Sequence, residues 1–473
     1  MSLMRKGLIA IVGTTGVGKS QLAIEIARSI NGEIINADAL QVYKGYDIIT
    51  NKVTSSEMHG IPHHLLGTVP VQHEYTVQEF ERDALQKISE IHSRNHVPIL
   101  VGGTHYYVQS VMFGKSLVRQ PRLDPDLRKF ERSNELKSNA ELWNELREKD
   151  PVMAENWHAN NRRKVLRSLE VLHTTGRKHS EWVRETEMAR KHEDVLRYPS
   201  LLFWLHADTQ VLNERLDARV DVMVGRGMFD ELEKLGREMR DQGVELSQED
   251  YTTGVKQAIG FREFQPYFHA LHTNAPDVDA HKAAGIVDMK TSTRRYAKRQ
   301  ISWLRNKLVP ECQTTLEKTR HARVFVLDAT DLTQWNSSVR DEGLRLTRMF
   351  LANDTLPDPA SLSPAAAELM GDVKPPNSVL AWKRHLCHVC SIKDVQVWLN
   401  GDDEFQQHQK SRRHRRNVQW QRKNAREEQA DRSGSVKATN EEQTVTCESL
   451  KFTQGEPTDT NDSSKPVQGE ASI

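Results

Sequence analysis

The chain has 473 residues, which is long enough for two or three domains and for at least one large buried core. Its 66 lysines and arginines balance 65 aspartates and glutamates, so binding partners must be sought at local charge clusters rather than through net charge. Only four cysteines in this length exclude a disulfide scaffold and predict a reducing compartment. The sequence has no run of about 18 apolar residues, so no membrane-spanning helix is predicted.

The first predicted elements are a strand, a glycine-rich loop and a helix. Leu8–Val12 is an apolar run of strand length, and apolar residues recur at helical spacing after Ser20. The segment between them reads GTTGVGKS and satisfies the phosphate-loop pattern GxxxxGK[ST]. Backbone N–H groups at the start of a helix favour an anion, to which Lys19 adds a charge and Ser20 a ligand for Mg²⁺. The anion-binding residues predicted in this way are Gly13, Thr14, Thr15, Gly16, Val17, Gly18, Lys19 and Ser20. The alternative is an ordinary glycine-rich turn.

The first strand begins so close to the N-terminus that the sequence leaves no room for a signal or transit peptide. We therefore expect a cytoplasmic protein, with its distribution among cytosol, nucleus and mitochondrion left open.

Four further apolar runs predict strands at Glu33–Asn36, Pro98–Val101, Leu201–Leu205 and Val324–Leu327. Helical patterns separate these runs, which predicts an α/β fold of the P-loop NTPase-like kind, with a parallel sheet flanked by helices. Ligands of such sheets bind beyond the carboxyl ends of the strands. The second strand ends in NADALQVY and the third in VGGTHYY, so Asp38, Gln41 and Thr104 are expected at this edge.

Asp38 has three possible roles at this position. A carboxylate beside a phosphate loop is often a Mg²⁺ ligand or a helix cap. It can also act as a general base that takes a proton from a nucleophile aimed at a bound phosphate ester. The residue type alone does not separate these roles.

Two basic clusters lie on predicted helices. The charged segment 114–200 has a helical pattern and is expected to be an insertion in the core; it carries Arg162, Arg163, Lys164 and Arg167 after Asn161. The second cluster includes Arg294, Arg295 and Lys298. Each cluster is either a solvated helix face or a surface that binds the phosphate backbone of RNA.

The C-terminal third changes in composition. Prolines predict a linker, and a segment with Cys387-x2-Cys390, seventeen residues, then His408-x5-His414 follows. This spacing fits a C₂H₂ zinc site; the alternative is a pair of reduced buried thiols with unrelated histidines. The last residues are polar and charged and are expected to be disordered. The predicted domains are an α/β core in two parts (1–113 and 201–351), a helical insertion (114–200), a linker (352–380), a zinc finger with a basic extension (381–426) and a tail (427–473).

Five motifs together resemble the tRNA dimethylallyltransferase family, also called the tRNA isopentenyltransferases: GTTGVGKS, NADALQVY, GIPHHL, PILVGGTHYY and TRRYAKRQISWLR. They occur in the same order over about 300 residues, and the Cys/His segment resembles the matrin or U1-like finger of the eukaryotic branch. The resemblance implies transfer of a dimethylallyl group from dimethylallyl diphosphate to N6 of adenosine 37 of tRNA. The phosphate loop would then hold a leaving group.

The resemblance also implies roles for single residues. Asp38 falls on the general base of the family, and Gln41 falls on the residue that recognises adenine. An amide side chain suits this role because it offers both a donor and an acceptor to the edge of the adenine base. Thr104 matches a threonine near the reactive amine, and Arg219 matches an arginine that binds the diphosphate. The implied tRNA-binding residues are Asp38, Ala39, Leu40, Gln41, Thr104, Asn161, Arg162, Arg163, Lys164, Arg167, Arg294, Arg295 and Lys298. The family usually has Ser where Ala39 stands.

The implied cofactors are Mg²⁺ with the diphosphate and a structural Zn²⁺, and the implied partners are the tRNA anticodon arm and dimethylallyl diphosphate. One channel per chain favours a monomer. Two other functions stay open at this point. A P-loop kinase would consume ATP without RNA and use Asp38 to deprotonate a hydroxyl. A non-catalytic RNA-binding protein led by its finger would not need Asp38.

Overall fold

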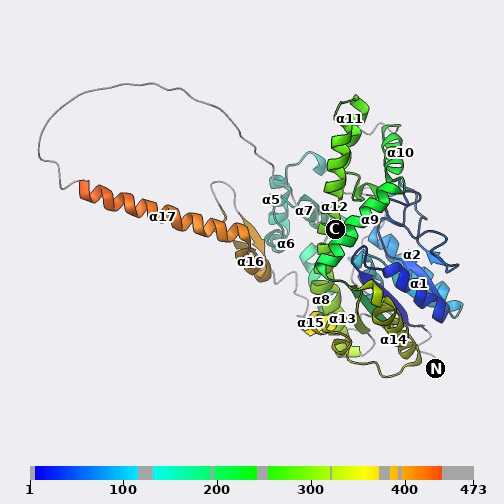
Figure 1. Ribbon diagram of the computed structural model, residues 1–473. Coiled ribbons are helices and arrows are strands. Elements are labelled where there is room, and N and C mark those ends of the chain that lie inside the picture. Colours follow the sequence, from blue (N-terminus) through cyan, green and yellow to red (C-terminus); the bar gives the residue numbers. More distant parts are fainter. Residues whose placement is uncertain are drawn as a thin grey trace, which may run out of the picture. The chain divides into compact units, whose positions relative to one another are not determined.

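The computed structural model describes residues 6–114, 130, 133–192, 196–241, 254–319, 322–371, 384–391 and 397–438. The chain divides into two compact units, each made of two stretches of sequence (Figure 1). Unit 1 comprises Met1–Arg119 and Thr186–Pro376, and unit 2 comprises Gln120–Glu185 and Asn377–Ile473. None of the helices within the described ranges is long and apolar enough to cross a membrane.

Unit 1 is built on a six-stranded parallel sheet with the strand order β3-β2-β4-β1-β5-β6. Its strands are β1 (Leu8–Gly13), β2 (Gly32–Asn36), β3 (His63–His64), β4 (Val97–Val101), β5 (Ser200–His206) and β6 (Ala322–Asp328). The structure confirms the predicted parallel sheet and contains all five predicted strands. It adds β3 from the GIPHHL segment, which is too short for an apolar pattern to reveal.

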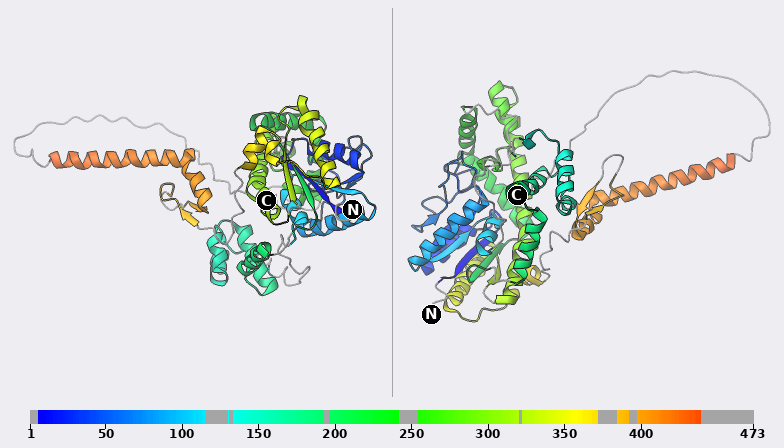
Figure 2. Two further views of the ribbon diagram at one scale, coloured as in Figure 1. Left: turned by 90° about the horizontal axis from the view of Figure 1, so that it is seen from below. Right: turned by 180° about the vertical axis from the view of Figure 1, so that it is seen from behind.

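Helices cover both faces of the sheet (Figure 2). One face packs against α2 (Val77–Ser93), α3 (His105–Met112), α13 (Val309–Thr319) and α15 (Pro364–Gly371), and the other against α1 (Lys19–Ile30), α9 (Thr209–Gly225) and α14 (Asp341–Ala352). Along β1, Leu8 and Ala10 point into the first layer while Ile9 and Ile11 point into the second. Because side chains alternate across a strand, burial on both faces requires the continuous apolar run that identified β1 in the sequence.

A third apolar cluster of unit 1 lies among the segment after β2 and four helices. Besides α9, these helices are α10 (Met228–Asp241), α11 (Gln265–Thr273) and α12 (Val278–Trp303). Unit 1 also has five short helical segments: η2 (Gly254–Gln257), η3 (Leu304–Leu308), η4 (Leu332–Gln334), η5 (Trp335–Arg340) and η6 (Pro359–Ser361). Glu231 of α10 accepts the backbone N–H groups of Ile48 and Ile49, which ties the segment after β2 to this layer. In this way α9 and α12 are held close to residues that follow β2.

Unit 2 contains the helical insertion as far as Glu185, within α8, and the Cys/His segment. The insertion has α5 (Asn139–Lys149), α6 (Pro151–Asn156), α7 (Arg162–Thr175) and α8 (His179–His192), and the Cys/His segment has β7 (Arg384–Leu386), β8 (Trp398–Asn400), α16 (Asp402–Gln409) and α17 (Arg412–Ala438). Leu142, Val165 and Leu169 form part of a small core of the insertion. Ser138 and Glu141 form a capping box that starts α5. The described part of the insertion is helical, as its charge and apolar pattern predict.

The structure divides the chain differently from the sequence prediction in three places. The insertion was expected to extend to residue 200, but unit 1 resumes at Thr186, and Arg197 donates to the carbonyl of Ser110. The prolines predicted a linker at 352–380, but α15 lies within it and buries Ala366 and Leu369 against the sheet. The tail was expected to begin at 427, whereas α17 continues to Ala438. The rest of the predicted tail, 439–473, lies outside the described residues.

Candidate functional site

The phosphate-loop sequence adopts the backbone of an anion-binding loop. Gly13 and Gly18 have φ values of 145° and 100°, and α1 starts directly after the loop at Lys19. A Cβ on Gly13 would lie 2.5 Å from the carbonyl oxygen of Leu205, and one on Gly18 would lie 2.7 Å from the ring of Trp335. Glycine is therefore required at both positions by backbone conformation and by space. The Lys19 ammonium folds back and donates to the carbonyl of Thr14 at 2.7 Å.

A cavity of about 380 Å³ adjoins this loop at the carboxyl edge of the sheet. Its size suits a small ligand. Glycines after β4 line it together with polar residues from the loop and the start of α1, from β2, β3 and the segment between them, and from α9 and α12: Thr15, Lys19, Ser20, Gln21, Asn36, Asp38, Gln41, Asn51, His63, Arg215, Arg219 and Gln300. The structure thus brings the predicted Asp38, Gln41 and Arg219 to one cavity with the phosphate loop.

Asp38 is held in a turn by local hydrogen bonds. Its Oδ1 accepts the N–H of Leu40 at 3.0 Å, and its own N–H donates to Oδ1 of Asn36 at 3.2 Å. The next residue, Ala39, donates its N–H to Oγ1 of Thr104 at 3.0 Å. Thr104 follows β4, so this bond connects the turn after β2 to the turn after β4.

Three charged groups influence one another in the cavity. Burial lowers the pKa of Lys19 to about 8, although the charge of Asp38 acts to raise it and that of Arg219 lowers it further. Burial likewise lowers the pKa of Arg219 to about 10, against the effect of Asp38. Lys19 and Arg219 are therefore two cations in one cavity with little water around them. An anion bound between them would stabilise the charged form of both side chains.

The amide of Gln41 is oriented by its surroundings. Its Nε2 donates to the carbonyls of Thr50 and Asn51, at 3.1 and 3.0 Å. The amide nitrogen is therefore occupied, and Oε1 is the atom with which Gln41 can recognise a ligand.

The sequence prediction missed Tyr296 and Gln300 of α12. Gln300 lines the cavity and hydrogen-bonds both Thr15 of the loop and Gly103 after β4. The two residues are four positions apart and so share one face of the helix. The TRRYAKRQ stretch was interpreted through its positive charges and as part of a family motif, and neither interpretation gave a role to Tyr296 or Gln300.

The basic cluster of the insertion makes several contacts within unit 2. Asn161 caps α7 by accepting the N–H of Lys164, and the guanidinium of Arg162 donates to the carbonyls of Asn134 and Lys137. The Lys164 ammonium lies 4.6 Å from the centre of the Trp157 ring, and Arg167 pairs with Glu170 at 3.0 Å. These bonds account for Asn161 and Arg162 without RNA, and the assignment of the cluster to tRNA binding stays a prediction.

The basic residues of α12 divide into two faces. Arg294 pairs with Asp217 of α9, and Lys290 pairs with Asp221 at 2.6 Å. Arg295 and Lys298 lie on the exposed side of the helix. This outer face is therefore the better candidate for phosphate contacts.

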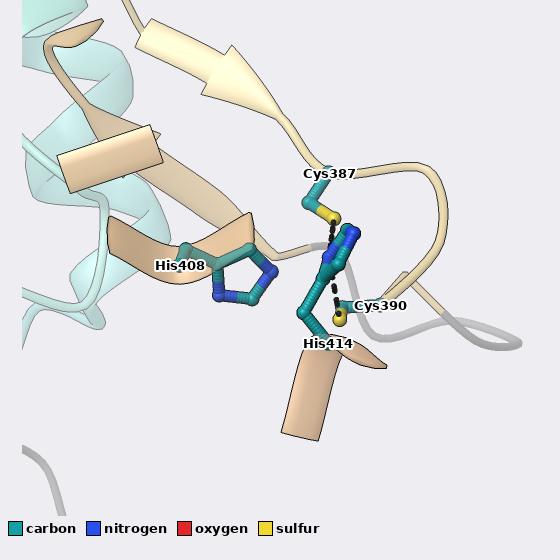
Figure 3. Close-up of side chains that lie close together, drawn as sticks. All are labelled: Cys387, Cys390, His408 and His414. Atoms are coloured by element: carbon teal, nitrogen blue, oxygen red, sulfur yellow. Dashed lines mark hydrogen bonds between the residues drawn. The ribbon is translucent and has the colours of Figure 1, made fainter. Parts of the chain in front are cut away.

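The predicted metal ligands of unit 2 converge (Figure 3). One donor atom from each of Cys387, Cys390, His408 and His414 lies within 4.8 Å of the other three. Nδ1 of His414 is 3.3 Å from the sulfur of Cys387 and 3.6 Å from that of Cys390. Nε2 of His408 is buried without a hydrogen-bond partner among the described residues. Two thiolates and two imidazoles could hold a metal ion here.

Comparisons with known proteins agree with this geometry. A family model described as IPP transferase matches residues 41–307. The chain is 36% identical over 435 residues to the tRNA dimethylallyltransferase of Schizosaccharomyces pombe, with 89% of this chain and 97% of that protein covered. It is 33% identical over 422 residues to the tRNA dimethylallyltransferase of Homo sapiens, with 86% and 85% covered. A crystal structure of a eukaryotic dimethylallyltransferase acting on tRNA matches with a TM-score of 0.71 and 33% identity, covering 90% of this chain and 99% of that one.

Proposed function

The chain belongs to the IPP transferase family, and from this we propose that it transfers a dimethylallyl group from dimethylallyl diphosphate to N6 of adenosine 37 in tRNA. The observation that carries the proposal is that the phosphate loop, Asp38 and Arg219 line one cavity. A prenyltransferase needs an anion site for the leaving group and a base for the nucleophile within reach of one another.

The leaving group is held by the phosphate loop in this proposal. As the allylic C–O bond breaks, negative charge grows on the diphosphate, where Lys19, Arg219 and the loop N–H groups stabilise it. Ser20 lines the same cavity and offers a hydroxyl oxygen to the Mg²⁺ that accompanies a diphosphate. When bound, this ion would neutralise part of the diphosphate charge.

The nucleophile is the exocyclic amine of adenosine, which is weak because its lone pair is delocalised into the ring. Asp38 accepts one amine proton while the N–C bond forms, so diphosphate leaves and no charge is left on N6. Gln41 offers Oε1 as an acceptor for a second amine hydrogen, since its nitrogen is occupied by two backbone carbonyls. Such a base has to leave the anticodon-loop stack to reach the cavity.

The Cys/His cluster supports a second part of the proposal, a structural Zn²⁺ bound by Cys387, Cys390, His408 and His414. This ion would hold β7, α16 and the start of α17 together. The arginines early in α17, among them Arg413 and Arg416, would then be presented to the tRNA phosphate backbone.

The experiment that tests the main proposal uses the purified full-length chain, tRNA and dimethylallyl diphosphate labelled in the prenyl group, without ATP. We expect label in the RNA with the wild-type chain. An Asp38→Asn chain should bind tRNA with the same affinity and transfer no label. Label that appears only with ATP and a small acceptor would indicate a kinase, and unchanged transfer by Asp38→Asn would exclude Asp38 as the base.

A further inference from the structure

Gln300 of α12 lies between the phosphate loop and the turn after β4. Its Oε1 accepts the N–H of Thr15, and its Nε2 donates to the carbonyl of Gly103, each at 2.9 Å. Gln300 is only 4% exposed to solvent. Because one partner is a donor and the other an acceptor, the pair fixes which way the buried amide points.

This contact requires glycine at position 103. A Cβ there would lie 2.5 Å from Nε2 of Gln300 and 3.4 Å from Oδ2 of Asp38. A side chain would therefore displace the amide. The same two distances show that Gln300 and Asp38 approach Gly103 closely.

Tyr296, one helical turn before Gln300, makes a second connection. Its hydroxyl lies beside the side chains of Thr104 and Gln300, and burial, followed by the charge of Asp38, raises the pKa of Tyr296. Thr104 in turn holds the N–H of Ala39, the residue next to Asp38. Through these two side chains α12 contacts both the loop that holds the leaving group and the turn that holds the base.

We propose that Tyr296 and Gln300 are positioning residues that set the distance between the bound diphosphate and Asp38. The inference rests on the proposed transfer reaction and deepens it, since neither residue has to touch the substrate. Gln300 also occupies one loop N–H that an anion could otherwise use. Removing Gln300 should therefore slow the transfer without weakening the binding of the anion.

The test is a Gln300→Met chain, which keeps side-chain volume and loses both hydrogen bonds. We expect the single-turnover rate of prenyl transfer to fall by about a hundredfold, because a misplacement of the reacting groups has an effect of this size. The affinity for inorganic diphosphate should stay the same or increase, and tRNA affinity should not change. Tyr296→Phe, which removes only a hydroxyl, should slow the transfer in the same way by about tenfold.

Thr293→Val is the matched control, because the Thr293 hydroxyl is buried in the same helix and bonds only the carbonyl of Met289 among the described residues. It should transfer at the wild-type rate. Wild-type rates in both test variants, or a loss of diphosphate affinity that parallels the loss of rate, would overturn the inference. If Gln300→Met does not fold, Tyr296→Phe decides the question. A wild-type chain that transfers nothing would instead refute the proposed function itself.

Discussion

The protonation of Lys19 depends strongly on its surroundings in the cavity. The loop holds its ammonium against the carbonyl of Thr14, and burial lowers its pKa from 10.5 to about 8. The unliganded protein therefore loses this charge as the pH rises through about 8. A bound diphosphate favours the charged form and raises the pKa again, so binding takes up a proton above that pH.

We predict that the affinity for inorganic diphosphate falls as the pH is raised from about 7 to 9, by at most about tenfold per unit. Titration calorimetry in buffers of different ionisation enthalpy would measure both the affinity and the proton uptake. A Lys19→Arg chain stays charged over this range and should lose most of the pH dependence. An affinity that is flat over the range in the wild-type chain would show that Lys19 does not titrate there.

Arg219 is the second cation of the cavity, and its removal tests whether it stabilises the departing diphosphate. We predict that Arg219→Gln slows the transfer by about 10²- to 10³-fold, because the loss of one donor to developing charge has this effect. Affinity for tRNA should not change. Single-turnover rates would measure the loss, and Arg226→Gln, at the exposed end of the same helix, is the control. Equal rates in both variants would contradict the role of Arg219.

Among the elements, α12 combines structural and ligand-facing sides on one helix. Gln300 lines the cavity, Arg294 pairs with α9, and Arg295 and Lys298 are exposed. We expect phosphate contacts on the exposed side, because its charged groups do not take part in the ion pairs with α9.

We predict that the double variant Arg295→Gln, Lys298→Gln binds tRNA more weakly. The slope of log affinity against log salt concentration should become shallower by the amount expected for the loss of about two phosphate contacts. Affinity for diphosphate should be unaffected. Filter binding of tRNA over a series of salt concentrations would measure the slope. The control Lys87→Gln changes a partly exposed lysine of α2 that pairs with Glu90. A slope that is unchanged in the double variant would place the RNA elsewhere.

The elements show how far the sequence could predict this fold. The five longer strands are continuous apolar runs because both sheet faces are buried, and such runs can be read directly. Strand β3 has only two residues, and the burial of α15 depends on a tertiary contact that proline content does not reveal. At the site, the motifs identified the loop, Asp38 and Gln41. The bonds of Gln300 to Thr15 and Gly103 cross 285 and 197 residues, so no local pattern predicts them.

At the scale of the whole molecule, chemistry and metal binding are separated. Every residue that lines the cavity belongs to unit 1, and the four Cys and His residues belong to unit 2. The two activities should therefore respond differently when the metal is removed.

We predict one Zn²⁺ per chain by elemental analysis. Its removal by a chelator, or Cys387→Ser, should weaken tRNA binding, because the segment loses the ion that orders it. Affinity for diphosphate should stay within about twofold, since unit 1 retains its own core. Loss of diphosphate affinity together with zinc would contradict this separation.

The most direct measurement is mass spectrometry of nucleosides from the tRNA of cells that lack this protein and are then supplied with either the wild-type or the Asp38→Asn chain. The account predicts that adenosine carrying a dimethylallyl group disappears in the deletion, returns with the wild-type chain and does not return with Asp38→Asn. Prenylated adenosine that persists in the deletion, or that Asp38→Asn restores as well as the wild-type chain, would contradict it.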